Sequence, residues 1–138
     1  MKKTERQRLI NANDILFSLI VRLKGKRCKK CGKYGEPKQD GMMIDGLDCS
    51  HWHGRQNMIL RYDEKNADCL CSGCHRYWWH GNKTETIARK EWEKRFPERD
   101  KYLLDKLKNQ PMSFKADVYW IKKQNILLKD ILNTLITK

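Results

Sequence analysis

Apolar residues recur at helical spacing in several parts of the chain, and this pattern predicts much of its secondary structure. The first run predicts a helix over residues 14–23, with Asn13 or Asp14 as its capping residue. Its apolar positions are Ile15, Leu16, Leu19, Ile20 and Leu23. Few polar positions separate them, so we expect this helix to be buried. The residues before it, 2–13, are polar and basic.

The same periodicity predicts three helices in the second half of the chain, over residues 84–96, 97–108 and 113–136. Pro97 separates the first two of these helices. In the helix over 84–96, the residues expected to face inward are Ile87, Ala88, Trp92 and Phe96. The apolar stripe of the last helix, which either packs internally or joins two chains, comprises Ile121, Leu128, Ile131, Leu132 and Leu135.

Strand-like segments occupy the middle of the chain. Met42–Ile44 and Leu47–His51 flank Asp45-Gly46, a dipeptide that favours a tight hairpin turn, so we predict a hairpin there. Residues 52–65 have the composition of an extended loop. A short strand is expected over Ala67–Leu70.

A helix is expected to follow that strand, beginning near Ser72 and ending at Gly81-Asn82. The predicted order is therefore a helix, a ββα unit and further helices, which is an α+β fold. The expected divisions are a basic segment and helix over 1–25, a ββα core over 26–82 and a helical extension over 83–138.

The charge balance points to a polyanionic partner. The chain has 30 lysines and arginines against 17 aspartates and glutamates, a formal net charge of +13 in 138 residues. Nucleic acid is the expected partner, because neutralising phosphates releases bound counterions. The longest apolar run, Ile15–Leu23, is too short to span a bilayer, and no signal peptide is evident, so we expect a cytoplasmic protein without a membrane partner.

Cysteines form two CxxC pairs, Cys28/Cys31 and Cys71/Cys74, about 40 residues apart. In a reducing compartment such pairs indicate metal ligands, and four thiolates complete one tetrahedral structural Zn²⁺ site. Cys69 is an alternative to Cys71 as a ligand, and His75 is an alternative to Cys74. Cys49 is expected to be a small buried side chain.

His51 and Asn66 lie between the cysteine pairs, and His75 directly follows the second pair. Asn66 lies 15 positions after His51, and His75 lies 9 positions after Asn66. With the segments CKKCGK, DCSHWHGR, LRYDEKNADCLCSGCH and HGN, this arrangement resembles the HNH (ββα-metal) endonucleases. Within that family the chain is most similar to NinG-type recombination proteins of lambdoid phages and related zinc-containing phage endonucleases, over roughly residues 14–82.

The resemblance implies a treble-clef-like zinc core and a role for each signature residue. His51 is the expected general base, Asn66 orients it, and His75 binds a catalytic Mg²⁺ or Mn²⁺. Many HNH enzymes place an acidic metal ligand directly before the base, where this chain has Ser50. Asp48 or His53 is expected to replace that ligand, the alternative being a metal with few protein ligands.

Contacts with DNA phosphates are expected from basic side chains near these residues. The family pattern assigns a phosphate to Arg55, and the candidates from charge alone are Arg61, Lys29 and Lys30. His80 has no expected partner and is assigned to the surface.

The expected function is metal-dependent cleavage of DNA, duplex or branched, in recombination or as a nicking enzyme, in the cytoplasm of a bacterial host if a phage encodes the chain. Cutting a four-way junction twice favours a homodimer. Alternatives are an HNH nuclease acting with a packaging terminase or in restriction, a non-catalytic zinc module that binds DNA, and an RNA-binding treble-clef protein.

Overall fold

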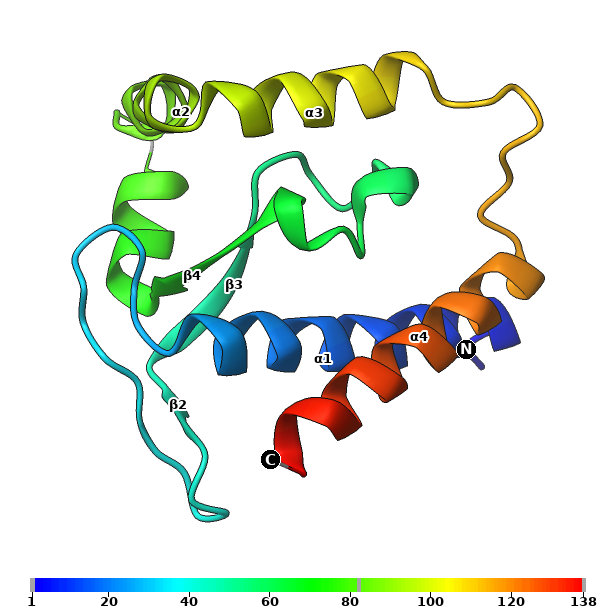
Figure 1. Cartoon of the computed structure of the whole chain (residues 1–138), viewed down its shortest axis with the longest axis horizontal. Coiled ribbons are helices and arrows are strands. Elements are labelled where there is room, and N and C mark those ends of the chain that lie inside the picture. Colours follow the sequence, from blue (N-terminus) through cyan, green and yellow to red (C-terminus); the bar gives the residue numbers. More distant parts are fainter. Residues whose placement is uncertain (1, 82, 138) are drawn as a thin grey trace.

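A sheet of two strands lies at the centre of the computed structural model, which describes residues 2–81 and 83–137. The strands β3 (Leu47–His51) and β4 (Ala67–Cys71) have helices on both sides (Figure 1). Asn82, the expected end of a helix and of a domain, lies outside the described residues. The helices are α1 (Glu5–Gly25), α2 (Glu85–Arg95), α3 (Pro97–Lys108) and α4 (Val118–Ile136), with short helical segments η1 (Met58–Leu60), η2 (Glu64–Asn66) and η3 (Cys74–Trp79). The expected α+β class is confirmed.

Helix α1 begins earlier than its apolar run indicates. Thr4 is the capping residue, and its hydroxyl accepts a hydrogen bond from the backbone N–H of Gln7 at 3.1 Å. Asn13, the expected cap, is fully buried inside the helix. Its side-chain amide donates to the carbonyl of Ile121 at 3.1 Å and accepts from Asn125 at 2.7 Å, so it joins α1 to α4. The predicted start was wrong because this long-range contact orders the polar segment.

The predicted hairpin at Asp45-Gly46 is also wrong. The strand β2 (Met43–Asp45) pairs with β1 (Glu36–Pro37), whereas β3 pairs antiparallel with β4 over its whole length. Gly46, with φ at 82°, only bends the chain between β2 and β3. All five residues of β4 are buried, so pairing with β4 covers far more surface than pairing with the short β2.

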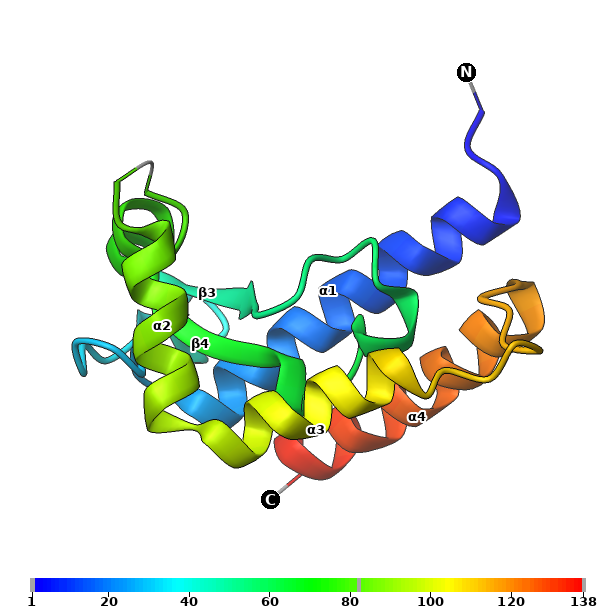
Figure 2. The ribbon, with the colours of Figure 1, turned by 90° about the horizontal axis from the view of Figure 1, so that it is seen from above.

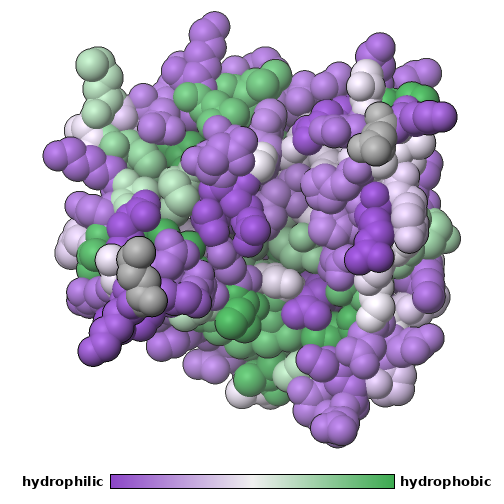
Figure 3. Space-filling model, turned by 180° about the vertical axis from the view of Figure 1, so that it is seen from behind, coloured by the Kyte–Doolittle hydropathy of each residue, from purple (hydrophilic) through white to green (hydrophobic). Residues whose placement is uncertain are grey.

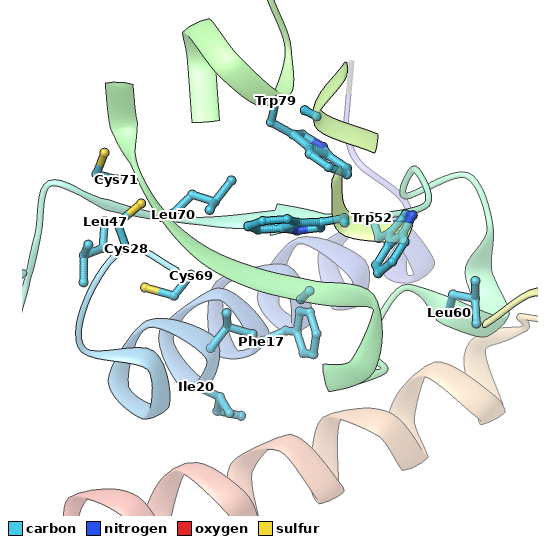
Figure 4. Close-up of a cluster of buried hydrophobic side chains, with 14 of the residues drawn as sticks. Phe17, Ile20, Cys28, Leu47, Trp52, Leu60, Cys69, Leu70, Cys71 and Trp79 are labelled. Carbon is cyan, nitrogen blue, oxygen red and sulfur yellow. The ribbon is translucent and has the colours of Figure 1, made fainter. Parts of the chain in front are cut away.

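The core lies between α1 and the helices that follow the strands. Phe17 of α1 points toward the strands from one side, and Trp79 and Trp52 lie on the other, while Ile20 points from α1 toward α4 (Figure 4). In α2, Ala88 and Trp92 are buried as expected and Phe96 after it is half-buried, but Ile87 is 62% exposed. The inner stripe of α2 runs through positions 88 and 92, and this places position 87 on its flank.

Helix α4 begins at Val118, later than expected, because Asp117 caps it by accepting from the backbone N–H of Trp120 at 2.9 Å. Its predicted stripe packs internally against α1 and the core: Ile121 and Leu128 are buried, and the other members are partly covered. Among residues 2–81 and 83–137, no helix combines the length and the apolar character needed to cross a membrane.

Candidate functional site

Four cysteine side chains converge from the two CxxC pairs. The ligand atoms of Cys28, Cys31, Cys71 and Cys74 all lie within 4.8 Å of one another. The first pair sits on a tight turn in which the backbone N–H of Gly32 donates to the carbonyl of Cys28 at 2.9 Å. The second pair spans the end of β4 and the start of η3. This cysteine cluster can hold a structural metal ion such as zinc.

The electrostatics of the cysteine cluster favour a bound cation. Burial opposes ionisation of Cys28, but backbone N–H groups around its sulfur outweigh burial and lower its pKa to about 7. Burial and the neighbouring sulfurs raise the pKa of Cys74. Thiolates that repel one another in this way are stabilised together by a divalent cation.

The two alternative ligands lie outside the cysteine cluster. Cys69 packs so closely on the end of α1 that a Cβ added at Gly25 would come within 2.4 Å of the Cys69 Cβ. His75 directs its Nδ1 to Asp48 instead. The structure therefore groups Cys71 and Cys74, rather than Cys69 and His75, with the first pair.

A second feature is a cavity of about 590 Å³ between α1, β3 and η3, called the central cavity below. The lining residues are Asp14, Ser18, Arg22, Leu47, Asp48, Cys49, His51, Gly54, Arg55, His75, His80 and Arg89. Seen from above, the amino-terminal half of α1 and the helix α2 lie on opposite sides of the end of β3 (Figure 2). Seen from behind, the molecule shows mostly hydrophilic side chains, and hydrophobic ones gather toward the lower edge (Figure 3).

His51, at the end of β3, lines the central cavity, and one of its ring nitrogens is already hydrogen-bonded within the protein. Its Nε2 lies 3.1 Å from the backbone carbonyl of Arg61. A carbonyl only accepts, so Nε2 carries the proton and Nδ1 is the acceptor in the neutral ring. Burial lowers the pKa of His51, the nearby Arg55 charge lowers it further, and the bond to Arg61 partly offsets both effects. The ring is therefore kept neutral with a free proton acceptor.

Asp48 of β3 and His75 of η3 lie side by side in the lining of the central cavity. The His75 Nδ1 and the Asp48 Oδ2 are 3.0 Å apart. Two neighbouring ligands of an octahedral cation, each bonded at about 2.1 Å, are separated by about the same distance. A carboxylate and an imidazole also suit divalent ions such as Mn²⁺. These two residues thus fit a divalent cation.

Asn66 forms hydrogen bonds with the loop that follows His51 rather than with His51 itself. Its side chain accepts from the backbone N–H of His53 at 2.8 Å and donates to the carbonyls of His53 and Leu60 at 3.0 and 3.3 Å. Its own carbonyl accepts from the N–H of Trp52 at 2.8 Å. A fully buried amide with all these bonds fixes the loop that leaves β3, so any effect on His51 is indirect.

His80 is exposed, as expected, and it also lines the central cavity. Its ring centroid lies 4.8 Å from that of His75. In an α-helix, residues five apart point about 140° away from each other. Segment η3 is π-helical, and the backbone N–H of His80 donates to the carbonyl of His75 at 3.1 Å, so the two rings share one side.

Three arginines line the central cavity, and Arg61 does not. Arg22, Arg55 and Arg89 come from α1, the loop after β3 and α2. Arg61 is 13% exposed and holds Asp14 through two nitrogens at 2.9 and 2.6 Å, so its guanidinium is already committed. Phosphate contact therefore remains an interpretation for Arg55 but does not fit Arg61.

Other predicted site residues lie elsewhere. Lys29 pairs with Asp68 at 3.5 Å and Lys30 with Glu91 at 2.8 Å, beside the cysteine cluster. His53 is not among the residues that line the central cavity. Burial lowers its pKa, and the nearby charges are those of Arg89, Asp100 and Glu93. The structure brings Asp48, but not His53, to His75.

Comparisons of the chain with family models, curated proteins and solved structures found no match.

Sequence reasoning missed the residues that α1 and α2 contribute to the central cavity. Asp14 and Arg22 lie eight positions apart on one side of α1, yet in the sequence Asp14 has the features of a capping residue. Arg89 lies on a helix that follows the motif region. A basic residue in a charged helix gives no signal of its own, because only the folded chain brings it to the histidines.

Proposed function

We propose that the chain is a metal-dependent endonuclease of the HNH type that hydrolyses phosphodiester bonds in DNA. One observation carries the proposal: a neutral histidine with a free Nδ1 shares a cavity with a carboxylate–imidazole pair and three arginines. A phosphodiesterase needs a base for water, a holder for a cation and positive charge for the phosphate. The order of elements also supports the proposal, because two paired strands, β3 and β4, are followed by the short helical segment η3.

His51 takes a proton from water at Nδ1 while the water oxygen bonds to phosphorus and the opposite P–O bond breaks. Asp48 and His75 would hold the divalent cation, whose charge stabilises the pentacoordinate phosphate and the departing oxygen. Arg55, exposed over 61% of its side chain, and Arg22 and Arg89 supply further positive charge. Asn66 keeps the loop after His51 in place.

The cysteine cluster has a separate role in this proposal. With zinc bound, it would join the turn after α1 to the junction of β4 and η3, and so hold His75 opposite β3. The substrate favoured by the resemblance is branched or duplex DNA handled in phage recombination. Packaging and restriction are alternative settings for the same chemistry.

The test is cleavage of supercoiled plasmid, linear duplex and a four-way junction with Mg²⁺ or Mn²⁺. His51→Ala is expected to lower the cleavage rate by about 10²–10⁴-fold while DNA binding stays near wild type. His53→Ala is the matched control, because this histidine lies two residues away but outside the central cavity.

Three outcomes would decide against the proposal. Wild-type-like cleavage by His51→Ala would remove His51 as the base. Tight DNA binding without cleavage by the wild-type protein, under all metal conditions, would favour a non-catalytic zinc module. Preferential binding of RNA duplexes over DNA in the same assay would assign a different nucleic acid.

A further inference from the structure

The Asp14 carboxylate of helix α1 is linked to His51 through one residue, Arg61. Both oxygens of Asp14 accept hydrogen bonds from Arg61, from Nε at 2.9 Å and from a terminal nitrogen at 2.6 Å. The side chains are only 22% and 13% exposed, respectively. A two-pronged pair of this kind fixes a guanidinium in direction as well as in distance.

The backbone of Arg61 is held at the same time. Its second terminal nitrogen donates to the carbonyl of Arg55 at 3.0 Å, and its N–H donates to the carbonyl of Met58 at 3.1 Å. The guanidinium thus ties both ends of the loop 55–61 to α1. The carbonyl of Arg61 that faces His51 Nε2 belongs to this fixed loop.

The same helix also supports the His51 ring directly. Phe17 lies one turn after Asp14, and its ring centroid is 5.6 Å from that of His51. Phe17 is buried, so the imidazole has a rigid apolar neighbour on one side and the Arg61 carbonyl at Nε2.

We propose that Asp14 is a positioning residue: it anchors Arg61, whose carbonyl in turn selects the His51 tautomer that presents an unprotonated Nδ1 to the central cavity. The inference rests on the proposed role of His51 as a base. It adds a helix that precedes the motif region to the active site. Asp14 itself does not exchange a proton or contact the reacting phosphate in this scheme.

The experiment compares Asp14→Asn with wild type by ¹⁵N NMR of the imidazole nitrogens and by cleavage kinetics. Wild type is expected to show His51 protonated at Nε2 when neutral. Asp14→Asn is expected to show a mixture of both tautomers, with kcat lowered about 10–100-fold and KM changed less than about threefold. Asp14→Glu, which retains the carboxylate, is expected to recover part of both losses.

Glu5→Gln is the matched control, since Glu5 also forms an ion pair from α1, with Lys122 at 3.1 Å, on an exposed surface. It is expected to leave the tautomer and kcat unchanged. If Asp14→Asn does not fold, Arg61→Lys provides the same test, because lysine keeps the charge but cannot form the two-pronged contact.

An unchanged Nε2-protonated tautomer in the folded variant would overturn the inference. A redistributed tautomer in a protein whose wild type cleaves no nucleic acid would instead retain the positioning role of Asp14 and reject the proposed function. The spectroscopic and kinetic readouts therefore separate the two failures.

Discussion

At the scale of single residues, the environment of His51 sets the pH range in which it can act. A base works only when unprotonated, so its rate rises with pH until the pKa is passed and is level above it. Burial lowers the pKa of His51 below the ordinary value of 6.5. The proton acceptor is therefore available at neutral pH and in mildly acidic solution.

The lowered pKa of His51 gives a measurable pH dependence of the cleavage rate. The acid limb of kcat/KM against pH is expected to have its midpoint below 6.5, the ordinary histidine value. The positive charge of Arg55 contributes to the depression, so Arg55→Ala is expected to move the midpoint to higher pH. A midpoint above 6.5 in wild type, or a shift to lower pH in the variant, would contradict this assignment of charges.

At the scale of elements, a buried ion pair joins the sheet to the two helices that follow it. Asp68 of β4 accepts from Arg99 of α3 at 2.7 and 2.9 Å and from the indole of Trp92 in α2 at 2.8 Å. The Asp68 side chain is 3% exposed. Removing it leaves a partly buried guanidinium without its counter-charge, which is far more costly than losing a surface pair.

Asp68→Ala is accordingly expected to lower the free energy of unfolding by about 3–5 kcal/mol, as measured by denaturant titration. Asp105→Ala is the control, since Asp105 pairs with Lys101 on the exposed side of α3 and both side chains are more than half exposed. Its expected effect is within about 0.5 kcal/mol. Equal effects of the two substitutions would show that the Asp68 pair adds no stability.

The cysteine cluster couples distant elements in the same way. We expect about one zinc ion per chain, and a lower Tm after chelation or in Cys28→Ser. Cys49→Ser, at a cysteine outside the cluster, is expected to keep its zinc. Folded protein that contains no zinc by elemental analysis would contradict this prediction.

Elements whose patterns are local could be predicted from the sequence, and contacts between distant residues could not. The CxxC pairs, the α3 helix after Pro97 and the strand β4 follow from local patterns and were predicted correctly. The hairpin at Asp45-Gly46 failed because a turn preference does not determine which strand a segment will pair with. Asp14 was interpreted as a cap because its partner, Arg61, is 47 positions away.

At the scale of the whole molecule, the basic side chains that give the net charge of +13 differ in how exposed they are and in how closely they pair with acidic side chains. Several lysines near the cysteine pairs form local ion pairs, such as Lys24 with Glu64 at 2.9 Å and Lys30 with Glu91 at 2.8 Å. Arg55 is also paired, with Asp14 at 3.6 Å, but its side chain is 61% exposed and lines the central cavity. If nucleic acid is the partner, we therefore expect Arg55 to contribute more to its binding than Lys30 does.

Salt dependence of DNA binding distinguishes these two sets. Arg55→Ala is expected to reduce the slope of log affinity against log salt by about 0.9, the value for one phosphate contact. Lys30→Ala removes an equal charge from a less exposed side chain that pairs more closely, with Glu91 at 2.8 Å, and is expected to leave the slope unchanged. The opposite pattern would assign the nucleic-acid contact to Lys30 instead.

The bonds between Asn13 and the last helix affect the order in which the molecule assembles. These bonds join residues 108 and 112 positions apart, so a large loop must close before they form. On a ribosome, the face of α1 that α4 covers stays without its partner until residues 118–136 have emerged. The cysteine cluster can close earlier, because its outermost members are Cys28 and Cys74. Nascent chains are therefore expected to bind metal before α1 is locked, and the helix that carries Asp14 should reach its final position late in folding.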